Sequence, residues 1–436
     1  MKKKNKDYKR ARSFVIRRNK DSILNIISFV LVGIACGVSI GLFKKSIAFI
    51  SGHNINFLTR ASGNITLSVA IIILFIIIGS FIYYLAKKNP MIAGSGIPIV
   101  YGMLEGKFEP KLANTLLSKF LASSLAIGSG LSLGREGPSV QIGALIGQLG
   151  HKLLKCKENK IYYIGAAAGA GISVAFNAPI TGLLFTIEEI YNKTNRKIFL
   201  SSAITIFSAV LTSNILFGNL PSLANLPMIK DTDLSNVFYV ILLGVICGLS
   251  GVFFNKIVIG SKDFFGKIKI NPFIKYLLPF VLTAIVLLFD IELFASGEEF
   301  IFLPLGENKS IGGLIALYFV KIGLLSLAFS QSIPGGSLVP LIVLGSILGN
   351  IVASILFNLG LIDSSSILLF SMLAMCGHFS AIIRAPITAI ILVFEMSGGV
   401  FNYLLGLFLV SLISYSIVEL CKSKPFYSDL YDRMKN

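Results

Sequence analysis

The chain has 436 residues, of which 54% are hydrophobic and only 14% are charged, and its mean hydropathy is +0.81. A soluble protein of this length could not bury so much apolar surface, so the composition excludes the soluble classes and predicts an integral membrane protein. The net charge of +18 does not indicate a nucleic-acid partner, because many of the basic residues gather at the two ends of the chain.

These basic ends predict how the chain is oriented in the bilayer. Residues 1–21 contain ten lysines and arginines directly before the first apolar stretch, and residues 422–436 contain four more. Lysine and arginine are enriched on the cytoplasmic side of membrane proteins, where anionic lipids attract them. We therefore expect two short cytoplasmic ends on a multi-pass protein of the cell (inner) membrane, with no regulatory domain after the second.

Five apolar stretches predict membrane-spanning helices of about 20 residues, the last of them shorter. No alternation of period two runs through the chain, which argues against a β-barrel. Between the spans lie shorter segments interrupted by Gly and Pro, which indicate broken or re-entrant helices. The fold class is therefore an all-α polytopic membrane protein. The predicted spans are Ile23–Phe43, Thr66–Ala86, Phe199–Phe217, Val237–Phe254 and Tyr276–Phe289.

The spans fall into two membrane halves. The first is expected at 22–217 and the second at 236–421, joined by a polar loop at 218–235 that is rich in Asn, Pro and Asp. Within the second half, Lys262–Lys269 and Gly297–Lys309 are expected to form exposed loops.

The two halves share a sequence pattern. The Gly and Pro positions within 134–147 return within 336–349, offset by 202 residues, and Ala178–Thr181 recurs as Ala385–Thr388, offset by 207. One membrane unit therefore occurs twice, with its Gly/Pro breaks at corresponding places. In secondary transporters this pattern indicates a substrate site between the repeats, near the middle of the bilayer.

Four segments that contain glycine or proline coincide with predicted helix starts. Proline in a first helical turn loses no hydrogen bond, and the preceding glycines expose free backbone N–H groups. A helix N-terminus carries roughly +0.5 charge, so converging N-termini would bind an anion without a full positive charge and could still release it. The segments are Gly94–Pro98, Gly134–Pro138, Asn177–Pro179 and Gly335–Pro340.

Glu136 lies inside one of these segments, directly before the helix predicted at Pro138–Leu154. A charged side chain at the centre of a spanning helix costs about 2.5–3.5 kcal/mol on insertion scales, so an intramembrane acid is a candidate functional residue. Ser95 and Ser337 add hydroxyl donors to two neighbouring segments.

Five motifs in register resemble those of the CLC family of chloride channels and chloride/proton antiporters, over nearly the whole chain. The resemblance implies a homodimer with one pore per subunit, each subunit an inverted repeat of broken, tilted helices that carries chloride and protons. The motifs are GSGIP (94–98), GREGP (134–138), FNAP with a later EE (176–179, 188–189), GGxxxP (335–340) and KPFYS (424–428).

The same resemblance implies the residues of the anion site. Ser95 corresponds to the serine whose hydroxyl coordinates the central chloride, and Tyr427 to the tyrosine whose phenol does so from the cytoplasmic side. The backbone amides of Ser337 and Leu338 correspond to those that complete the shell. Ser95 also favours chloride over nitrate and argues against the fluoride-specific branch.

For protons, the resemblance assigns Glu136 as the external gate and Glu189 as the internal glutamate of antiporters. A carboxylate that competes with an anion must be protonated or displaced before the anion binds, which couples the two ions in opposite directions. Glu189 lies eleven residues into a helix starting near Ala178, about 16 Å along it at 1.5 Å per residue. This distance allows a separate proton route, although a plain helix-end position facing the cytoplasm stays open.

Two departures from the family pattern affect these assignments. Leu338 stands where relatives commonly have an aromatic residue, which bears on occlusion of the ion and on rate. Ile99 stands where many relatives have a glutamate, so a local charge contact is missing.

Several remaining polar residues have structural and functional interpretations. Lys119 and Lys321 are single basic residues in apolar surroundings, which either snorkel, raise the potential along the pore, or pair with Glu395 or Glu188. The three histidines are isolated and are expected to be structural or exposed. The five cysteines lack CxxC spacing and are expected to be small hydrophobes, so we predict no metal site and no cofactor.

Three alternative functions remain. A passive channel of the same family is the main one, and Glu189 argues against it, because such channels usually have an uncharged residue there. Gly130–Gly134 spells G-x-S-x-G, so an intramembrane serine protease using Ser132 and His378 is a remote alternative, although no predicted strand precedes the motif. A cation or amino-acid carrier is disfavoured by the helix N-termini. We therefore predict a chloride/proton antiporter and not an enzyme.

Overall fold

The computed structural model describes residues 2–156, 158–218, 237–306, 309–399 and 401–435, with side chains from Ile23 onward. Almost all of these residues lie in helices. The predicted connecting loop 218–235 lies outside the described residues except for Gly218.

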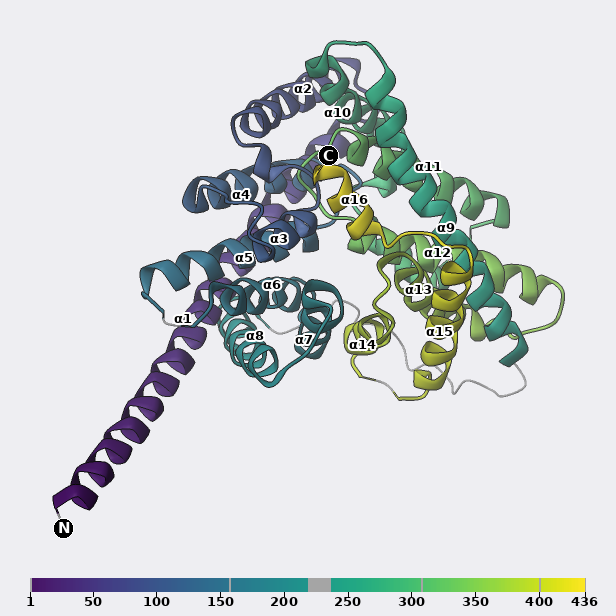
Figure 1. Cartoon of the computed structure of the whole chain (residues 1–436). Coiled ribbons are helices and arrows are strands. Elements are labelled where there is room, and N and C mark those ends of the chain that lie inside the picture. Colours follow the sequence, from purple (N-terminus) through teal and green to yellow (C-terminus); the bar gives the residue numbers. More distant parts are fainter. Residues whose placement is uncertain (1, 157, 219–236, 307–308, 400, 436) are drawn as a thin grey trace.

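The described residues of the first half form eight α-helices, one short 3₁₀-helix and one short π-helix. Helix α1 continues without a break from Lys2 through the first predicted span, and its N-terminal part projects away from the body (Figure 1). In chain order the helices are α1 (Lys2–Ala61), α2 (Ile65–Lys88), η1 (Pro90–Ile92), α3 (Ile97–Leu104), α4 (Leu112–Gly128), α5 (Glu136–Leu153), α6 (Lys160–Phe176), α7 (Pro179–Phe185), the π-helix η2 (Thr186–Tyr191) and α8 (Arg196–Phe217).

The second half repeats this order and ends with one additional helix. Its elements are α9 (Val237–Lys267), α10 (Pro272–Phe289), η4 (Ile291–Leu293), η5 (Glu298–Leu305), α11 (Ile311–Ser330), α12 (Leu338–Asn358), α13 (Ser366–Ile383), α14 (Pro386–Met396), α15 (Leu404–Leu420) and α16 (Phe426–Lys435).

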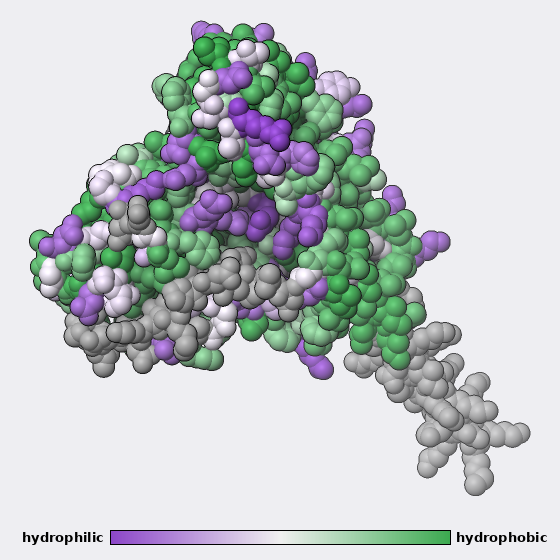
Figure 2. Space-filling view, turned by 180° about the vertical axis from the view of Figure 1, so that it is seen from behind, coloured by the Kyte–Doolittle hydropathy of each residue, from purple (hydrophilic) through white to green (hydrophobic). Residues whose placement is uncertain are grey.

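The packing confirms that one unit occurs twice. Helix α5 packs on α6 as α12 packs on α13, and α8 packs on α1 as α15 packs on α9. The halves meet where α2 contacts α10 and where α7 contacts α14, and α16 lies near the line between them (Figure 1). Hydrophobic side chains cover much of the outer surface seen from behind, whereas hydrophilic ones gather around a central hollow (Figure 2).

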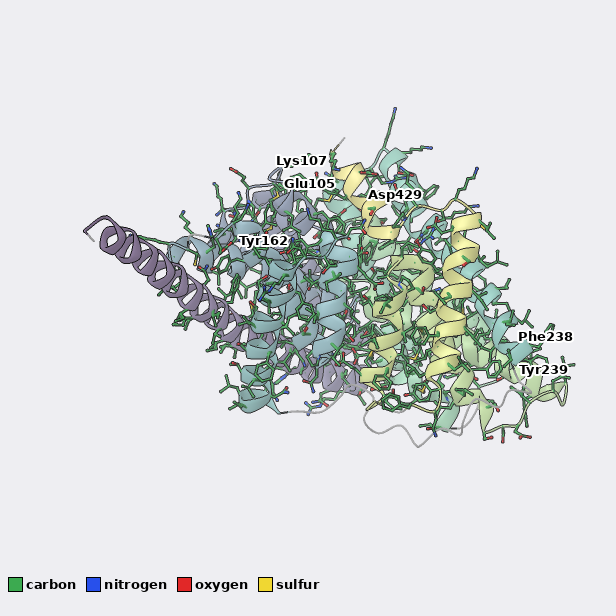
Figure 3. The ribbon with its side chains drawn as sticks, turned by 60° about the horizontal axis from the view of Figure 1, so that its bottom comes forward. Glu105, Lys107, Tyr162, Phe238, Tyr239 and Asp429 are labelled. Atoms are coloured by element: carbon green, nitrogen blue, oxygen red, sulfur yellow. The ribbon has the colours of Figure 1, made fainter. Side chains whose placement is uncertain are left out.

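Eight helices of the described residues are long and apolar enough to cross a membrane. All five predicted spans fall within them, and α11, α12 and α13 provide the other three. Glu105, Lys107 and Asp429 lie at the edge of the molecule that carries α16, whereas Phe238 and Tyr239, at the start of α9, lie toward the opposite edge (Figure 3). We refer to the first of these edges as the α16 face.

The glycines that recur with the 202-residue offset serve helix packing as well as helix starts. A Cβ on Gly143 would lie 2.1 Å from the carbonyl oxygen of Ala167 in α6. In the other half, a Cβ on Gly345 would lie 2.8 Å from the carbonyl oxygen of Ala374 in α13. Small residues let the backbones of membrane helices approach this closely, so the repeated glycines fix the α5–α6 and α12–α13 contacts.

Two predicted loops of the second half are wrong. Helix α9 extends to Lys267 and packs beside α11 and α16: Ser261 donates to the carbonyl of Ser326 in α11 at 3.0 Å, and Asp263 pairs with Arg433 of α16 at 2.5 Å. The segment predicted as a loop at 297–309 contains η5, whose Phe300 is buried and whose backbone packs on α12. Residues 307–308 of this segment are outside the described residues.

Candidate functional site

Three of the four predicted helix starts meet in the interior, and each of these three contains glycine. Gly134 and Gly336 form an antiparallel bridge, in which each N–H donates to the carbonyl of the other at 2.7 and 2.6 Å. The N–H of Gly335 donates to the carbonyl of Gly94 at 3.2 Å. The starts of α3, α5 and α12 are therefore tied together by their backbones, and their positive dipole ends lie in one small region.

Gly137, in the first turn of α5, has no room for a side chain. A Cβ on this residue would lie 2.3 Å from Ser95 Oγ, 2.6 Å from Ser95 O and 3.2 Å from the Cα of Gly336. The three helix starts are thus in contact around a residue that must be glycine. This closeness places the Ser95 hydroxyl directly beside the first turn of α5.

Glu136 is the first residue of α5, and its side chain is fully buried. Its Oε1 lies 3.8 Å from Arg135 Nε, and the backbone of Val339 in α12 is also close to the carboxylate. Neither carboxylate oxygen has a hydrogen-bond partner among the described residues. A cavity of about 210 Å³, lined by Arg135, Glu298 and Val339, lies next to it. The carboxylate therefore occupies the region where the helix N-termini meet.

The predicted anion ligands lie in the same interior region. Ser95 comes directly before the N-cap of α3, Ser337 is the N-cap of α12, Leu338 is the first residue of α12, and Tyr427 is in the first turn of α16. All four are at most 3% exposed. The hydroxyls of Ser337 and Tyr427 are 3.0 Å apart and hydrogen-bonded, and Tyr427 also lies near Ser95. Ser95 Oγ has no hydrogen-bond partner in the described part of the chain.

Glu189 lies in η2 and is partly buried. The hydroxyl of Tyr101, in α3, donates a hydrogen bond to Glu189 Oε1. Both residues line a cavity of about 620 Å³, which Tyr431 and Lys435 of α16 also line. Glu189 therefore lines a large cavity and also contacts α3, whose N-cap directly follows Ser95.

Helix α16 separates this cavity from a second one. Tyr431 lines the cavity beside Glu189, whereas Leu430 lines a space of about 40 Å³ that contains Ser95 and Lys262. The cavity beside Ser95 and the cavity beside Glu189 are thus lined by different residues of α16.

The start of α7, the fourth glycine/proline segment, does not join the central region. Glu395 of α14 accepts hydrogen bonds there from the N–H of Ile180 at 3.0 Å and from the N–H and hydroxyl of Thr181, both at 2.7 Å. The repeat partner does the same in reverse. Glu188 accepts from the N–H of Ile387 at 3.3 Å and from Thr388 at the start of α14. The two Thr388 bonds, from its N–H and its hydroxyl, measure 2.7 and 2.6 Å.

These reciprocal caps correct the expectation that Lys119 or Lys321 pairs with Glu188 or Glu395. Lys119 Nζ donates to the carbonyls of Ile92 at 2.9 Å and Gly94 at 2.7 Å. Lys321, its counterpart 202 residues later, donates to the carbonyls of Leu293 at 3.3 Å and Ala295 at 2.6 Å. Both lysines are buried, so they do not snorkel. The glutamates are already used as helix caps, and the lysines hold backbone turns.

The serine and histidine of the G-x-S-x-G alternative are not brought together by any contact in the described residues. His378 Nδ1 lies 2.7 Å from the carbonyl oxygen of Leu341, and the Ser132 hydroxyl has no hydrogen-bond partner there. No cluster of three His, Cys, Asp or Glu side chains that could hold a metal occurs among the described residues. Cys36, Cys247 and Cys376 are buried, as expected of small hydrophobes, whereas Cys156 is partly exposed and Cys421 is exposed.

Sequence reasoning missed Tyr101 and Lys262 as candidate functional residues. The sequence predicts Lys262 in a loop, whereas in the structure it lies on α9 and lines the cavity beside Ser95. Tyr101 lies six residues after Ser95 on the same short helix, but no motif marks its contact with Glu189. The shared 202-residue offset of Lys119 and Lys321 is a signal that would have indicated their common role.

Comparison with known proteins agrees with this architecture. Residues 78–419 match the family model described as voltage gated chloride channel. The structure is similar to that of a slow cyanobacterial Cl⁻/H⁺ antiporter, with a TM-score of 0.88 and 24% sequence identity over 94% of this chain and 98% of that one.

Two further structures are similar. One is a CLC-type fluoride/proton antiporter, with a TM-score of 0.76 and 23% identity over 93% of this chain and 97% of that one. The other is a eukaryotic CLC transporter, with a TM-score of 0.78 and 17% identity over 94% of this chain and 74% of that one. These likenesses confirm the predicted fold of broken membrane helices.

Proposed function

The chain belongs to the voltage-gated chloride channel family, and we propose that it is an antiporter that exchanges chloride for protons. The placement of two carboxylates supports this proposal. Glu136 lies among the converging helix starts, and neither of its carboxylate oxygens has a hydrogen-bond partner in the described residues. Glu189 lines a separate cavity at the α16 face. Members of this family are ion transporters and channels, not enzymes, so the serine-protease alternative is set aside.

Glu136 acts as the external gate in this proposal. Its carboxylate lies where an anion would bind, beside the first turn of α12. A carboxylate and an anion repel each other, so the site can hold an anion only after Glu136 is protonated or moves away. The cavity lined by Arg135 and Val339 supplies the route by which external protons and anions arrive.

Glu189 acts as the internal proton acceptor. Protons from the cytoplasm enter the cavity of about 620 Å³ and reach the carboxylate there. Chloride uses the other side of α16, past Lys262 toward Ser95. Because the two routes are separate, a proton can move inward or outward without following the anion, which an exchanger requires and a passive channel does not.

Chloride is the proposed anion, bound by the hydroxyls of Ser95 and Tyr427 and by the backbone N–H groups of Ser337 and Leu338. This set supplies only donors of moderate strength, so the ion is bound and released readily. The similar structures include both a chloride and a fluoride exchanger. The Ser95 hydroxyl favours chloride.

We further propose a homodimer with both termini in the cytoplasm. The four helices α7, α8, α14 and α15 lie along the lower edge of the view in Figure 1. They expose large apolar side chains, among them Phe207, Ile215, Leu405 and Leu412, which are 52–74% exposed and would contact either lipid or a second copy of the chain. Cross-linking in native membranes distinguishes a dimer from a monomer surrounded by lipid.

Two glutamine variants, assayed in vesicles, test the roles of the carboxylates. Glu136→Gln imitates a permanently protonated gate, so chloride should pass without proton coupling and without a response to external pH. Glu189→Gln should also lose proton transport, but its chloride flux should still respond to external pH because Glu136 remains. Uphill proton movement by Glu189→Gln at the wild-type ratio would remove its assignment, and an external pH response in Glu136→Gln would remove that of the gate.

A further inference from the structure

Tyr101 connects the two parts of the proposed exchanger through one short helix. Its hydroxyl donates to Glu189 Oε1, and no other side-chain donor to that carboxylate occurs among the described residues. Helix α3, which carries Tyr101, has only eight residues and begins at the turn that contains Ser95. The hydrogen-bond partner of the internal carboxylate and a ligand of the candidate anion site therefore belong to the same two turns of helix.

The other end of α3 is joined to α16. The rings of Tyr101 and Tyr431 meet edge to face with their centroids 5.8 Å apart. The Tyr431 hydroxyl donates to Glu105 Oε2 at 2.8 Å, directly after α3 ends. Hydrogen bonds from Lys107 and Tyr431 hold the pKa of Glu105 below its usual value, so this link persists as an ionised carboxylate. Tyr427, the second hydroxyl of the candidate anion site, lies on the same α16.

We propose that Tyr101 is a positioning residue of the internal proton site, which holds the Glu189 carboxylate against α3 and so ties proton binding to the anion site. This inference rests on the proposed antiport function. A hydroxyl that donates to an ionised carboxylate stabilises the ionised form and fixes its direction. When Glu189 takes up a proton, that hydrogen bond weakens, and α3 with its Ser95 end loses one of its attachments.

The other charged side chains that line this cavity do not hydrogen-bond to Glu189 in the described residues. Most of them have ion-pair or hydrogen-bond partners of their own, and among the described lining residues Lys193 is an exposed cation without such a pair. The pairs are Arg384 with Glu419 at 2.6 Å, Glu105 with Lys107 at 2.5 Å and with Lys435 at 3.8 Å, Asp432 with Lys435 at 3.6 Å, and Glu188 with the start of α14.

Tyr101→Phe removes only the hydroxyl and keeps the ring against Tyr431. Tyr191→Phe is the matched control, because Tyr191 lines the same cavity and lies two residues from Glu189, but its hydroxyl donates to the carbonyl of Ile161 at 2.8 Å. Purified protein in vesicles, with chloride efflux and proton uptake recorded together at a series of internal pH values, gives the ratio and the pH profile for each variant.

We expect Tyr101→Phe to carry fewer protons per chloride and to move the midpoint of its internal pH profile upward by about one unit, a tenfold change in proton affinity. Tyr191→Phe should keep the wild-type ratio and midpoint. A wild-type profile in Tyr101→Phe, or an equal shift in both variants, would overturn the positioning role. Absence of uphill proton movement in the unmodified protein would instead overturn the antiport function.

Calorimetry tests the positioning role of Tyr101 without a transport measurement, and so separates its failure from failure of the antiport function. The chloride affinity of detergent-solubilised protein is measured against pH for Tyr101→Phe, Glu189→Gln and the double variant. Because Tyr101 acts through Glu189, its substitution should change the pH dependence of chloride affinity in the unmodified background and have no effect once Glu189 is glutamine. Equal effects of Tyr101→Phe in both backgrounds would contradict the proposal, whether or not protons are pumped.

Discussion

The reciprocal caps formed by Glu188 and Glu395 make a testable prediction about how the two repeats hold together. The side chain of each glutamate reaches a helix start of the other repeat. There it accepts hydrogen bonds from two backbone N–H groups and one threonine hydroxyl. Glu188→Gln and Glu395→Gln remove the negative charge from these helix N-termini. Glutamine also has a single acceptor oxygen and turns an NH₂ group toward groups that are themselves donors.

The expected loss follows from these contacts. An N-cap interaction is worth about 0.5–2 kcal/mol, and a negative charge at a helix N-terminus adds about 0.3–1 kcal/mol, up to about 2 kcal/mol where it is partly buried. We expect each variant to lose about 2 kcal/mol of stability and the double variant to lose about 4 kcal/mol, because the two caps share no hydrogen bond. One kcal/mol shifts the melting temperature by about 2–4 °C in domains of 150–250 residues and by less in a longer chain.

A thiol-reactive fluorescent dye suits this measurement. The chain has no tryptophan. Cys36, Cys247 and Cys376 are buried and become reactive on unfolding, whereas the exposed Cys421 and the partly exposed Cys156 are first blocked with an unlabelled thiol reagent. Glu109→Gln serves as the control, because Glu109 is exposed in the folded protein. Both cap variants should melt several degrees below the unmodified protein, and the control should not.

The two cap variants should differ in transport. Glu188 lies beside Glu189 in η2, so its substitution should also lower the number of protons carried per chloride, whereas Glu395→Gln should leave that number unchanged. Melting temperatures equal to that of the Glu109→Gln control would refute the capping argument. Equal proton coupling in the two cap variants would refute the link between Glu188 and the internal site.

Three further predictions concern the anion site. Ser95→Ala and Tyr427→Ala should each weaken chloride binding by about 0.5–3 kcal/mol, as for loss of one hydrogen bond to a charged partner, and unchanged affinity of the double variant in calorimetry would place the site elsewhere. Gly137→Ala would put a Cβ 2.3 Å from Ser95 Oγ, so chloride titration should show affinity reduced by the roughly 1–3 kcal/mol typical of overpacking. Lys119→Met should weaken chloride binding by about 1–3 kcal/mol, because the Gly94 carbonyl loses its hydrogen-bond donor. Lys321→Met should lower the melting temperature but leave chloride affinity unchanged. Equal chloride affinities in the two lysine variants would contradict a special role of Lys119 at the anion site.

The repeated Gly/Pro pattern predicted the central feature of the fold. The helix starts at 94–98, 134–138 and 335–340 do converge, because glycine allows backbones to approach and proline fits a first helical turn. The same pattern does not distinguish helix breaks from helix contacts. Gly143 and Gly345 lie within helices, where they allow a neighbouring helix to pack closely. The start of α7 follows the same local pattern but is capped by Glu395, which depends on the contact between two repeats and is not encoded locally.

Contacts between distant segments account for the rest of what the sequence did not predict. Glu188 and Glu189 are consecutive residues of the π-helix η2, yet Glu188 contacts α14 and Glu189 contacts Tyr101, partners that local sequence does not indicate. Pairing with a carboxylate was one of three interpretations of Lys119, but in the packed structure its ammonium group donates to the backbone carbonyls of a turn. The polar residues of segment 262–269 resemble those of an exposed loop, but Asp263 pairs with Arg433 of α16 and most of the segment belongs to α9.

The most direct test of the account is a coupled flux measurement on the unmodified protein. Purified protein is placed in vesicles loaded with chloride and suspended in a low-chloride medium at matched pH, and chloride efflux and internal pH are recorded together. Chloride leaving the vesicles should drive protons inward until the interior is more acidic than the medium, against the proton gradient. Chloride efflux with no uphill proton movement, under conditions in which an added proton carrier does acidify the vesicles, would contradict exchange and identify a passive channel.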